Sequence, residues 1–316
     1  MIIDYSSHLI SPRTIKELEA IRDRHGLGKM RFHFPLSNAD LQFRISLLDK
    51  YEIDKQVISF SSPFLFGLDK GEAKRICSIA NEDVAEFCRK RPDRFVGLGH
   101  LSLLDVDSAL LELDKCVNEL GLKGVMIATN ENGMGIDSLQ IEPVYQRISD
   151  YGIPIFLHPT DWESYQLVQN EMMWIFGWPF DTTQAIWRLM TRGVLDKFPE
   201  LKIVTHHLGG MLPYFYGRAG GYLQAMGEDK WLRGKDEIWK QVYGDTALDG
   251  LLGALKCGYE FFGADRIVFG TDYPFGAESG EAFLRDNLTM IKKMSVSSDE
   301  KSKILSGNAK KLLKIQ

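Results

Sequence analysis

The chain has 316 residues, of which 44% are hydrophobic and 26% are charged, and its 38 basic and 43 acidic side chains give a net charge of -5. This composition provides enough apolar material for a large core and excludes a globally disordered chain. Because the total charge is mildly acidic and no polybasic block interrupts it, the sequence lacks the electrostatic footprint of a nucleic-acid-binding protein.

The chain opens with MIIDYSSHLI, which predicts a short apolar strand followed by polar residues. A secretory signal would need a basic start and a longer apolar stretch, and no apolar run elsewhere is long enough to span a bilayer. The cysteines are scattered without a CxxC pair, at Cys77, Cys88, Cys116 and Cys257. We therefore expect a soluble protein of the cytoplasm, a reducing compartment, with no membrane partner.

Short β-branched segments alternate along the chain with longer segments of helical period, which is typical of βαβ units and a parallel sheet. We predict eight strands, near residues 2–5, 56–60, 95–101, 124–128, 154–157, 202–205, 242–245 and 266–270. Amphipathic helices are predicted between them at 71–90, 106–120, 141–151, 182–197 and 250–262. An eightfold alternation closes most simply as a (β/α)8 TIM barrel in the α/β class. An open doubly wound sheet is the alternative, but its glycine-rich dinucleotide fingerprint is missing after the first strand.

Two long connections interrupt this regularity, near residues 11–41 and 160–181. Both follow strands at the end where barrels hold their active sites, so we expect them to form lids or pocket walls. No linker-like segment rich in proline, glycine or serine divides the chain. The sequence therefore predicts a single domain over residues 1–316 with these two insertions.

Polar side chains follow several of the predicted strands where each strand ends. In a barrel these ends converge on one mouth, and here they carry Ser6, Ser7, His8, His100, His158, His206, His207, Thr271 and Asp272. A single histidine beside a strand is most often a structural hydrogen-bonding group, so the prediction of a site depends on the set.

Histidines and a carboxylate from different strand ends can approach a common point closely enough to bind zinc. With His8, His158 and Asp272 as ligands, the site has three protein groups and an open position for water or substrate, as catalytic metals require. Structural zinc sites usually use closely spaced ligand pairs, whereas these residues are far apart in the sequence. The pattern favours a catalytic metal.

At these residues the chain resembles the amidohydrolase superfamily of the amidohydrolase-2 type. The most similar branch contains amino-carboxymuconate semialdehyde decarboxylase and the dihydroxybenzoate (resorcylate) decarboxylases. The resemblance is carried by IIDYSSH, RISLLDKYEIDKQVIS, IFLHP, WIFGWPFDTTQAIWRLMTRGVLDKFPELKIVTHHLGGMLPYFYGR and FGTDYPFG. It implies a distorted barrel that holds one divalent metal ion, usually zinc, with manganese as the alternative.

The resemblance assigns roles to single residues. His8 matches the second histidine of the opening Asp-x-His-x-His signature, and His158 and Asp272 match the ligands after strands five and eight. His207 matches the catalytic histidine, which implies that His206 packs beneath it, with the reverse assignment left open because adjacent side chains on a strand point opposite ways. Asp272 is the second catalytic candidate, as a proton acceptor.

Three further positions resemble the substrate-contacting residues of the decarboxylases: Arg44, Trp174 and Arg218. The residue that matches Arg218 reaches into the neighbouring subunit's site in the family, which implies a homodimer. One position departs from the family, because Ser6 stands where a histidine or glutamate ligand is usual. A serine hydroxyl is a poor zinc ligand, so this departure lowers the expected metal occupancy.

The sequence leaves three functions open. The first is non-oxidative decarboxylation of a small aromatic or unsaturated carboxylic acid, with arginines on carboxylates and His207 moving the proton. The second is hydrolysis of a lactone, amide or related acyl bond by a metal-activated water, with Asp272 or His207 as the base. The third is a non-catalytic binder on an inherited barrel, inactivated by Ser6.

Overall fold

Most strands of this protein form two arcs of parallel strands, and β6 (Asn130–Glu131) and β7 (Met134–Gly135) form a separate antiparallel pair. The structure, a computed structural model, describes residues 1–25, 39–161, 172–228 and 233–316. One arc has the order β1-β2-β3 and the other the order β11-β10-β9-β8-β5-β4. These strands are β1 (Ile3–His8), β2 (Lys55–Ser59), β3 (Phe95–Gly97), β4 (Gly99–His100), β5 (Val125–Ala128), β8 (Ile155–His158), β9 (Ile203–Thr205), β10 (Val242–Asp245) and β11 (Ile267–Val268).

Backbone hydrogen bonds join the two arcs at both of their seams. At one seam the Tyr5 amide donates to the Phe269 carbonyl at 2.7 Å, next to β11. At the other, the Leu98 amide donates to Ile58 of β2 at 2.8 Å, and the Gly99 amide donates to Gly124 beside β5 at 3.0 Å. The predicted third strand is therefore divided into β3 and β4, because the chain changes its partner strand between them. The barrel prediction is confirmed, with this division as its distortion.

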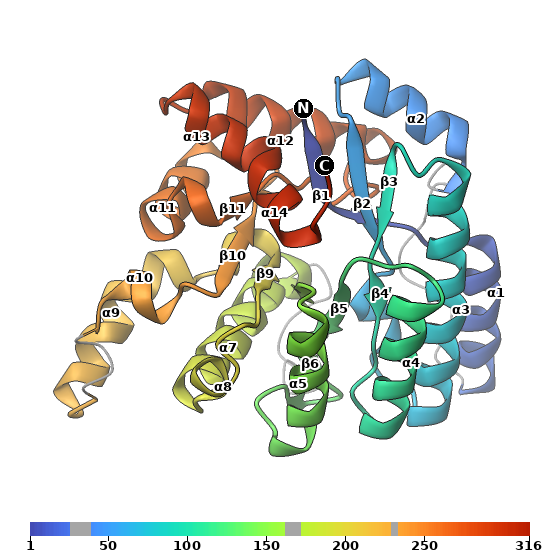
Figure 1. Cartoon of the computed structure of the whole chain (residues 1–316), viewed down its shortest axis with the longest axis horizontal. Coiled ribbons are helices and arrows are strands. Elements are labelled where there is room, and N and C mark those ends of the chain that lie inside the picture. Colours follow the sequence, from blue (N-terminus) through green and yellow to red (C-terminus); the bar gives the residue numbers. More distant parts are fainter. Residues whose placement is uncertain (26–38, 162–171, 229–232) are drawn as a thin grey trace.

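Helices surround the strands (Figure 1). The predicted ones correspond to α3 (Lys70–Lys90), α4 (Val106–Asn118), α5 (Glu142–Tyr151), α7 (Trp178–Thr191), α8 (Val194–Lys197) and α11 (Leu252–Phe262). The helix predicted over 182–197 is two helices, because Gly193 between them has a φ of 80°. The others are α1 (Pro12–Arg24), α2 (Leu41–Lys50), α9 (Leu212–Ala225), α10 (Lys235–Ile238), α12 (Glu281–Lys293), α13 (Ser298–Ser302) and α14 (Asn308–Leu313).

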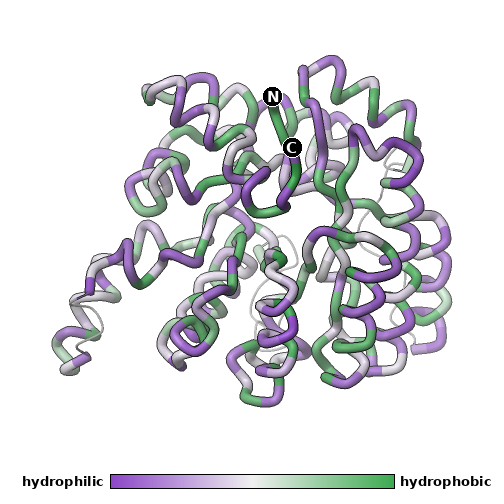
Figure 2. The backbone as a smooth tube through the Cα atoms, in the orientation of Figure 1, coloured by the Kyte–Doolittle hydropathy of each residue, from purple (hydrophilic) through white to green (hydrophobic). Residues whose placement is uncertain are grey.

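Local sequence explains where these elements begin and which face they bury. Helix α3 starts at a capping box, in which the Asp69 carboxylate accepts from the Glu72 amide and Glu72 reaches back to the Asp69 amide. The inner face of the barrel is filled by strand residues such as Tyr5, Met126 and Phe156. Figure 2 shows hydrophobic strands inside and hydrophilic stretches on the outer helices. Burial of these apolar side chains fixes the strand ends relative to one another.

The two predicted insertions lie only partly in the described chain. The first contains α1, and the second ends in the π-helical turn η5 (Met173–Gly177), while residues 26–38 and 162–171 lie outside the described residues. Helices α9 and α10 project away from the barrel (Figure 1). Within the described residues, no helix has both the length and the apolar character needed to cross a bilayer.

Candidate metal centre and its cavity

Four side chains converge at the carboxyl ends of the strands. His8 and His158 end β1 and β8, His206 directly follows β9, and Asp272 follows β11 by four residues. One ligand atom from each of them lies within 4.8 Å of the others. The Asp272 Oδ1 atom is 3.2 Å from His8 Nε2 and 3.3 Å from His206 Nε2. The structure thus brings the three predicted metal ligands together and adds His206 to them.

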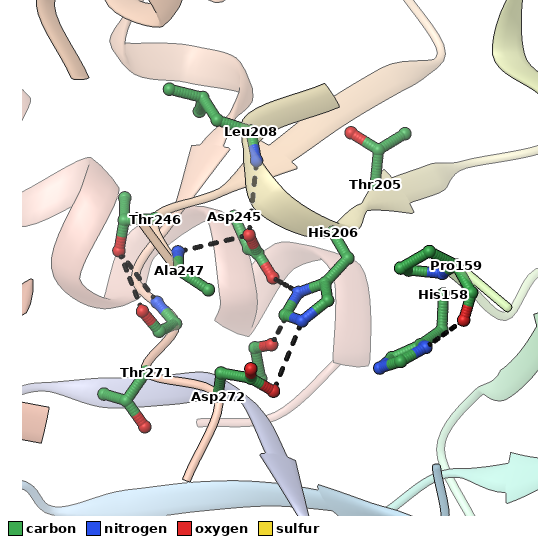
Figure 3. Close-up of polar contacts among 12 residues, drawn as sticks. His158, Pro159, Thr205, His206, Leu208, Asp245, Thr246, Ala247, Thr271 and Asp272 are labelled. Atoms are coloured by element: carbon green, nitrogen blue, oxygen red, sulfur yellow. Dashed lines mark hydrogen bonds and ion pairs between the residues drawn. The ribbon is translucent and has the colours of Figure 1, made fainter. Parts of the chain in front are cut away.

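The other ring nitrogen of each histidine is held by a separate group. His158 Nδ1 lies 2.7 Å from the Pro159 carbonyl oxygen, and His8 Nδ1 lies 3.3 Å from the Ser59 hydroxyl. His206 Nδ1 lies 2.5 Å from Asp245 Oδ2, so this ring sits between two carboxylates (Figure 3). A partner at Nδ1 fixes the ring and its tautomer, and leaves Nε2 to face the common point.

The donor atoms at this point fit a metal ion. His8 Nε2, His206 Nε2 and Asp272 Oδ1 are buried, and they have no hydrogen-bond partner in the described part of the chain. Buried polar atoms are normally hydrogen-bonded, so three that approach only one another around one point, at 3.2 and 3.3 Å, indicate a missing common partner. Imidazole and carboxylate donors suit zinc or manganese equally well in kind.

The charges of the cluster favour cation binding. Burial, and then the neighbouring His206 and His8, lower the pKa of His158 well below its usual value, and burial also lowers the pKa of His8. Both rings are therefore neutral ligands at pH 7. Burial opposes ionisation of Asp272, but His206 and His8 hold the pKa of that carboxyl far below its usual value.

His206 differs from the other two histidines. Burial disfavours its charged form, but the Asp245 and Asp272 carboxylates outweigh burial and raise the pKa of His206 to about 10. A metal ion must therefore displace a proton from this ring, and binding releases that proton.

Ser6 does not take the place of a ligand. Its side chain is buried, and its hydroxyl oxygen lies 3.3 Å from His206 Nδ1, on the side of the ring away from the shared point. The ligand that is usual in the family at position 6 is thus absent, as the sequence indicated, and His206 is the fourth residue of the group that could hold a metal ion. The sequence implied that His206 packs beneath His207 and left the reverse open, whereas the structure places His206 in the ligand group and His207 at the cavity wall. The reason is the sharp turn at His207, which has a φ of 51°, so the two side chains do not alternate as on a strand.

A cavity of about 600 Å³ opens beside the cluster. His158, Asp272 and His207 line its inner part, and its walls are largely aromatic: Trp174, Trp178, Phe275 and Phe283. Small-molecule sites typically measure roughly 300–1,000 Å³ and have apolar walls with a few polar groups. His207 and Trp174 therefore lie where the sequence predicted a catalytic group and an apolar wall.

The ring of His207 lies beside the cluster and is neutral. Burial, and then the charged His206, lower the pKa of its ring well below the usual value. Its Nδ1 atom has no hydrogen-bond partner in the described chain. A neutral imidazole has one N–H and one lone pair, so His207 can both accept and donate a proton at the cavity wall.

A buried polar network holds the cluster from behind. The Asp4 carboxylate accepts hydrogen bonds from the Thr271 hydroxyl at 2.7 Å, the Thr271 amide at 3.0 Å and Gln56 Nε2 at 2.8 Å. Burial raises the pKa of Asp4 to about 7. Because Thr271 precedes Asp272, this network fixes the loop that carries the cluster's carboxylate.

Arg44 belongs to this network and not to the cavity wall. Its guanidinium donates to the His8 carbonyl at 2.7 Å and to Gln56 Oε1 at 2.9 Å, and it lies 4.6 Å from the centre of the Tyr273 ring. Only 1% of the residue is exposed, and it does not line the cavity. The expectation that Arg44 contacts substrate is corrected, because α2 directs this side chain into the packed interior.

We expect Arg44→Met to lower the free energy of unfolding by about 3 kcal/mol, because it leaves the His8 carbonyl and the Gln56 side chain without buried partners. Denaturant unfolding of the metal-free protein measures this. Arg89→Met, at an exposed arginine, is the control and should change stability by less than about 0.5 kcal/mol. If Arg44→Met instead raised KM and left the free energy of unfolding unchanged, Arg44 would be a substrate-binding residue.

Arg218 lies outside the cavity of its own chain. It is exposed on α9, where its guanidinium lies 5.1 Å from the centre of the Tyr222 ring. The same helix exposes Tyr214, Phe215 and Tyr222, and the exposed Met226 follows its last residue.

Sequence analysis missed Asp245, Asp4 and Gln56. Asp245 ends a predicted strand, so the strand-end rule that selected the histidines could have found it. Asp4 and Gln56 lie within β1 and β2. The Asp4 carboxylate accepts hydrogen bonds from the Gln56 side chain and from the Thr271 hydroxyl, so both residues are buried between these strands and the Thr271 loop. Single residues in strand interiors carry no such signal.

Comparison with known proteins agrees with this geometry. A family model described as amidohydrolase matches residues 57–315. The 2-amino-3-carboxymuconate-6-semialdehyde decarboxylase of Dictyostelium discoideum is 30% identical over 282 residues, which cover 87% of this chain and 76% of that protein. The resemblance that the sequence motifs indicated is confirmed.

Solved structures share the fold over nearly the whole chain. A 2,6-dihydroxybenzoate decarboxylase in complex with 2,6-dihydroxybenzoate has a TM-score of 0.79 and 25% identity, and 99% of each chain is covered. A dihydroxybenzoic acid decarboxylase from Polaromonas sp. JS666, solved with bound manganese and the inhibitor 2-nitroresorcinol, has a TM-score of 0.78 and 24% identity. The match covers 99% of this chain and 96% of that one.

Proposed function

This chain belongs to the amidohydrolase family, and on that premise we propose that it is a metal-dependent, non-oxidative decarboxylase of a small aromatic or unsaturated carboxylic acid. The observation that carries the proposal is the convergence of four ligand atoms beside a cavity of about 600 Å³ with aromatic walls. The naming of the relatives as decarboxylases favours loss of CO2 over hydrolysis.

His8, His158, His206 and Asp272 hold one divalent ion in this proposal. The donor set suits zinc, and it also suits the manganese found in the Polaromonas enzyme. When bound, such an ion acts as a Lewis acid and orients the oxygens of the substrate. Asp245 supports the site by holding the His206 ring.

Decarboxylation replaces a carboxylate by a proton on the same carbon atom. The bond to the carboxyl carbon breaks, its electron pair stays with the ring or alkene carbon, and a proton takes the vacated position as CO2 leaves. His207 relays this proton, because its neutral ring lines the cavity next to Asp272: as one ring nitrogen gives its proton to the carbon, the other accepts a proton from solvent water. Trp174 and Trp178 hold the ring and exclude water.

A homodimer and a cytoplasmic location are parts of the same proposal. The exposed aromatic face of α9 supports the dimer, in which Arg218 reaches the partner's cavity and grips a carboxylate. The four free thiols support a reducing compartment.

The test is product analysis with the manganese- or zinc-loaded full chain. We expect CO2 release from at least one hydroxylated benzoate, such as 2,6-dihydroxybenzoate, with loss of the activity after chelation and recovery after the metal is restored. Lactones and amides are assayed in parallel. Hydrolysis without CO2 release would replace the decarboxylase by the hydrolase, and metal binding without turnover of either class would favour the non-catalytic binder.

A further inference from the structure

The cavity contains an acidic residue that the proposed reaction does not use. Asp249 lines it together with Asp272, and it is exposed, whereas the three histidines of the metal-binding cluster are buried and Asp272 is half-buried. Asp249 therefore lies toward solvent and the cluster lies at the inner end. A substrate that fills the cavity with its carboxylate at the cluster therefore meets Asp249 with another of its substituents.

The backbone around Asp249 is held firmly in an uncommon conformation. Asp249 has a φ of 52° and the next residue, Gly250, has a φ of 83°. The amides of Leu248 and Gly250 donate to the same atom, Asn287 Oδ1, at 3.1 and 3.4 Å. Asn287 is fully buried on α12. Asp249 thus has a left-handed backbone conformation, and hydrogen bonds from the residues before and after it to one buried side chain hold that conformation. Uncommon backbone conformations of this kind are often found at ligand sites.

Asp249 has no counter-ion in the part of the chain that the structure describes. The ionisable residues among the described cavity-lining ones are Asp249, Asp272, His158 and His207, and no lysine or arginine accompanies them. Asp272 is engaged by His8 and His206, whereas Asp249 has neither a hydrogen bond nor an ion pair with a described residue. Partial burial, and then the Asp272 charge, raise the pKa of Asp249 to about 6.

This placement determines which groups a substrate can present there. An ionised carboxylate only accepts hydrogen bonds, so a hydroxyl or amino group on the substrate satisfies it. A second carboxylate would be repelled by the like charge, in surroundings where walls of low polarity weaken screening. A ligand that leaves a polar group of its binding site without a hydrogen-bond partner is strongly disfavoured relative to a ligand that pairs with it.

We propose that Asp249 is a specificity-determining residue that selects aromatic acids with one carboxylate and a hydrogen-bond donor on the ring, and that excludes dicarboxylic acids. This inference rests on the proposed decarboxylase function and narrows its substrate class. It separates this chain's substrate from that of the carboxymuconate-type relative, which is named for an acid bearing an additional carboxyl group.

The test compares Asp249→Asn with the unchanged protein on matched salicylates that carry a hydroxyl, an amino group or a carboxylate at ring position 4 or 5. Asparagine tolerates the left-handed backbone, so the variant keeps the loop and loses only the charge. Measurements at pH 8 keep Asp249 ionised, and kcat/KM comes from CO2 release by the manganese-loaded full chain. Asp286→Asn is the control, since this nearby carboxylate pairs with Arg285 and does not line the cavity.

We expect the unchanged protein to prefer the hydroxyl or amino compound over its carboxylate counterpart by at least about 30-fold in kcat/KM, because a mismatched polar contact discriminates strongly. Asp249→Asn should lower this ratio by about tenfold or more, and Asp286→Asn should leave it unchanged. Equal ratios in the unchanged protein and Asp249→Asn, or a preference of the unchanged protein for the dicarboxylate, would overturn the inference.

Binding keeps this test separate from the proposed reaction. If none of the compounds releases CO2, the decarboxylase proposal fails, and the Kd values of the same compounds from calorimetry still decide the role of Asp249. A Kd ratio that changes with Asp249→Asn then supports the selectivity without the chemistry. If none of the compounds binds, both the decarboxylase proposal and the proposed selectivity of Asp249 are overturned.

Discussion

Asp272→Asn is expected to lower the rate of decarboxylation by at least about 1,000-fold, which corresponds to about 4 kcal/mol of lost transition-state stabilisation. The Asp272 carboxylate is the only anionic donor in the ligand cluster, and its Oδ1 atom faces both His8 and His206. A neutral amide keeps the size of the side chain and removes the charge that holds a divalent ion. We therefore expect metal content to fall together with the rate.

The measurement is metal analysis by mass spectrometry alongside the CO2 assay. Asp265→Asn is the matched control, because this exposed carboxylate pairs with Lys303 and is not among the described residues that line the cavity. It should keep both metal and rate. An Asp272→Asn protein that lacks metal and retains full activity would show that the ion has no role in the reaction.

The second large effect is expected at His207. His207→Asn should lower kcat by about 100-fold or more, the usual contribution of a positioned acid or base, with metal content unchanged. The reason is that His207 lines the cavity but is outside the ligand cluster. His25→Asn is the control, because this exposed histidine pairs with Glu72 at the end of α1.

The same variant also tests the roles of the two adjacent histidines. In this account His206→Asn loses the ion, whereas His207→Asn retains it and loses turnover. If His207→Asn instead lost the metal and His206→Asn kept it, the assignments would have to be exchanged. The rings lie 3.8 Å apart, so only a functional measurement that separates binding from turnover distinguishes them.

The barrel could be predicted from the sequence because its strands leave a strong local signal. Most are short apolar runs rich in β-branched residues, and five helices of clear amphipathic period alternate with them. What could not be predicted depends on how distant segments meet. The change of partner strand at Leu98 and the break at Gly193 are such cases, since neither alters the apolar pattern on which the prediction depends.

The candidate site likewise contains residues whose positions could be predicted from the sequence and residues whose positions could not. His8, His158 and Asp272 follow strands and could be predicted to converge, since parallel strand ends share one mouth. Arg44 resembled a substrate contact but is buried behind the site, because motif position does not fix the direction of a helical side chain. Asp249 lies beyond the end of β10, where its backbone conformation depends on Asn287 of a distant helix.

Anomalous diffraction from a crystal of the manganese-loaded protein tests the central claim most directly. The account predicts one peak per chain, bonded at about 2.0–2.2 Å to His8, His158, His206 and Asp272 and open toward the cavity lined by His207. No peak at this point at full manganese loading, or a peak bound by other residues, would contradict the claim that these strand ends form the metal centre.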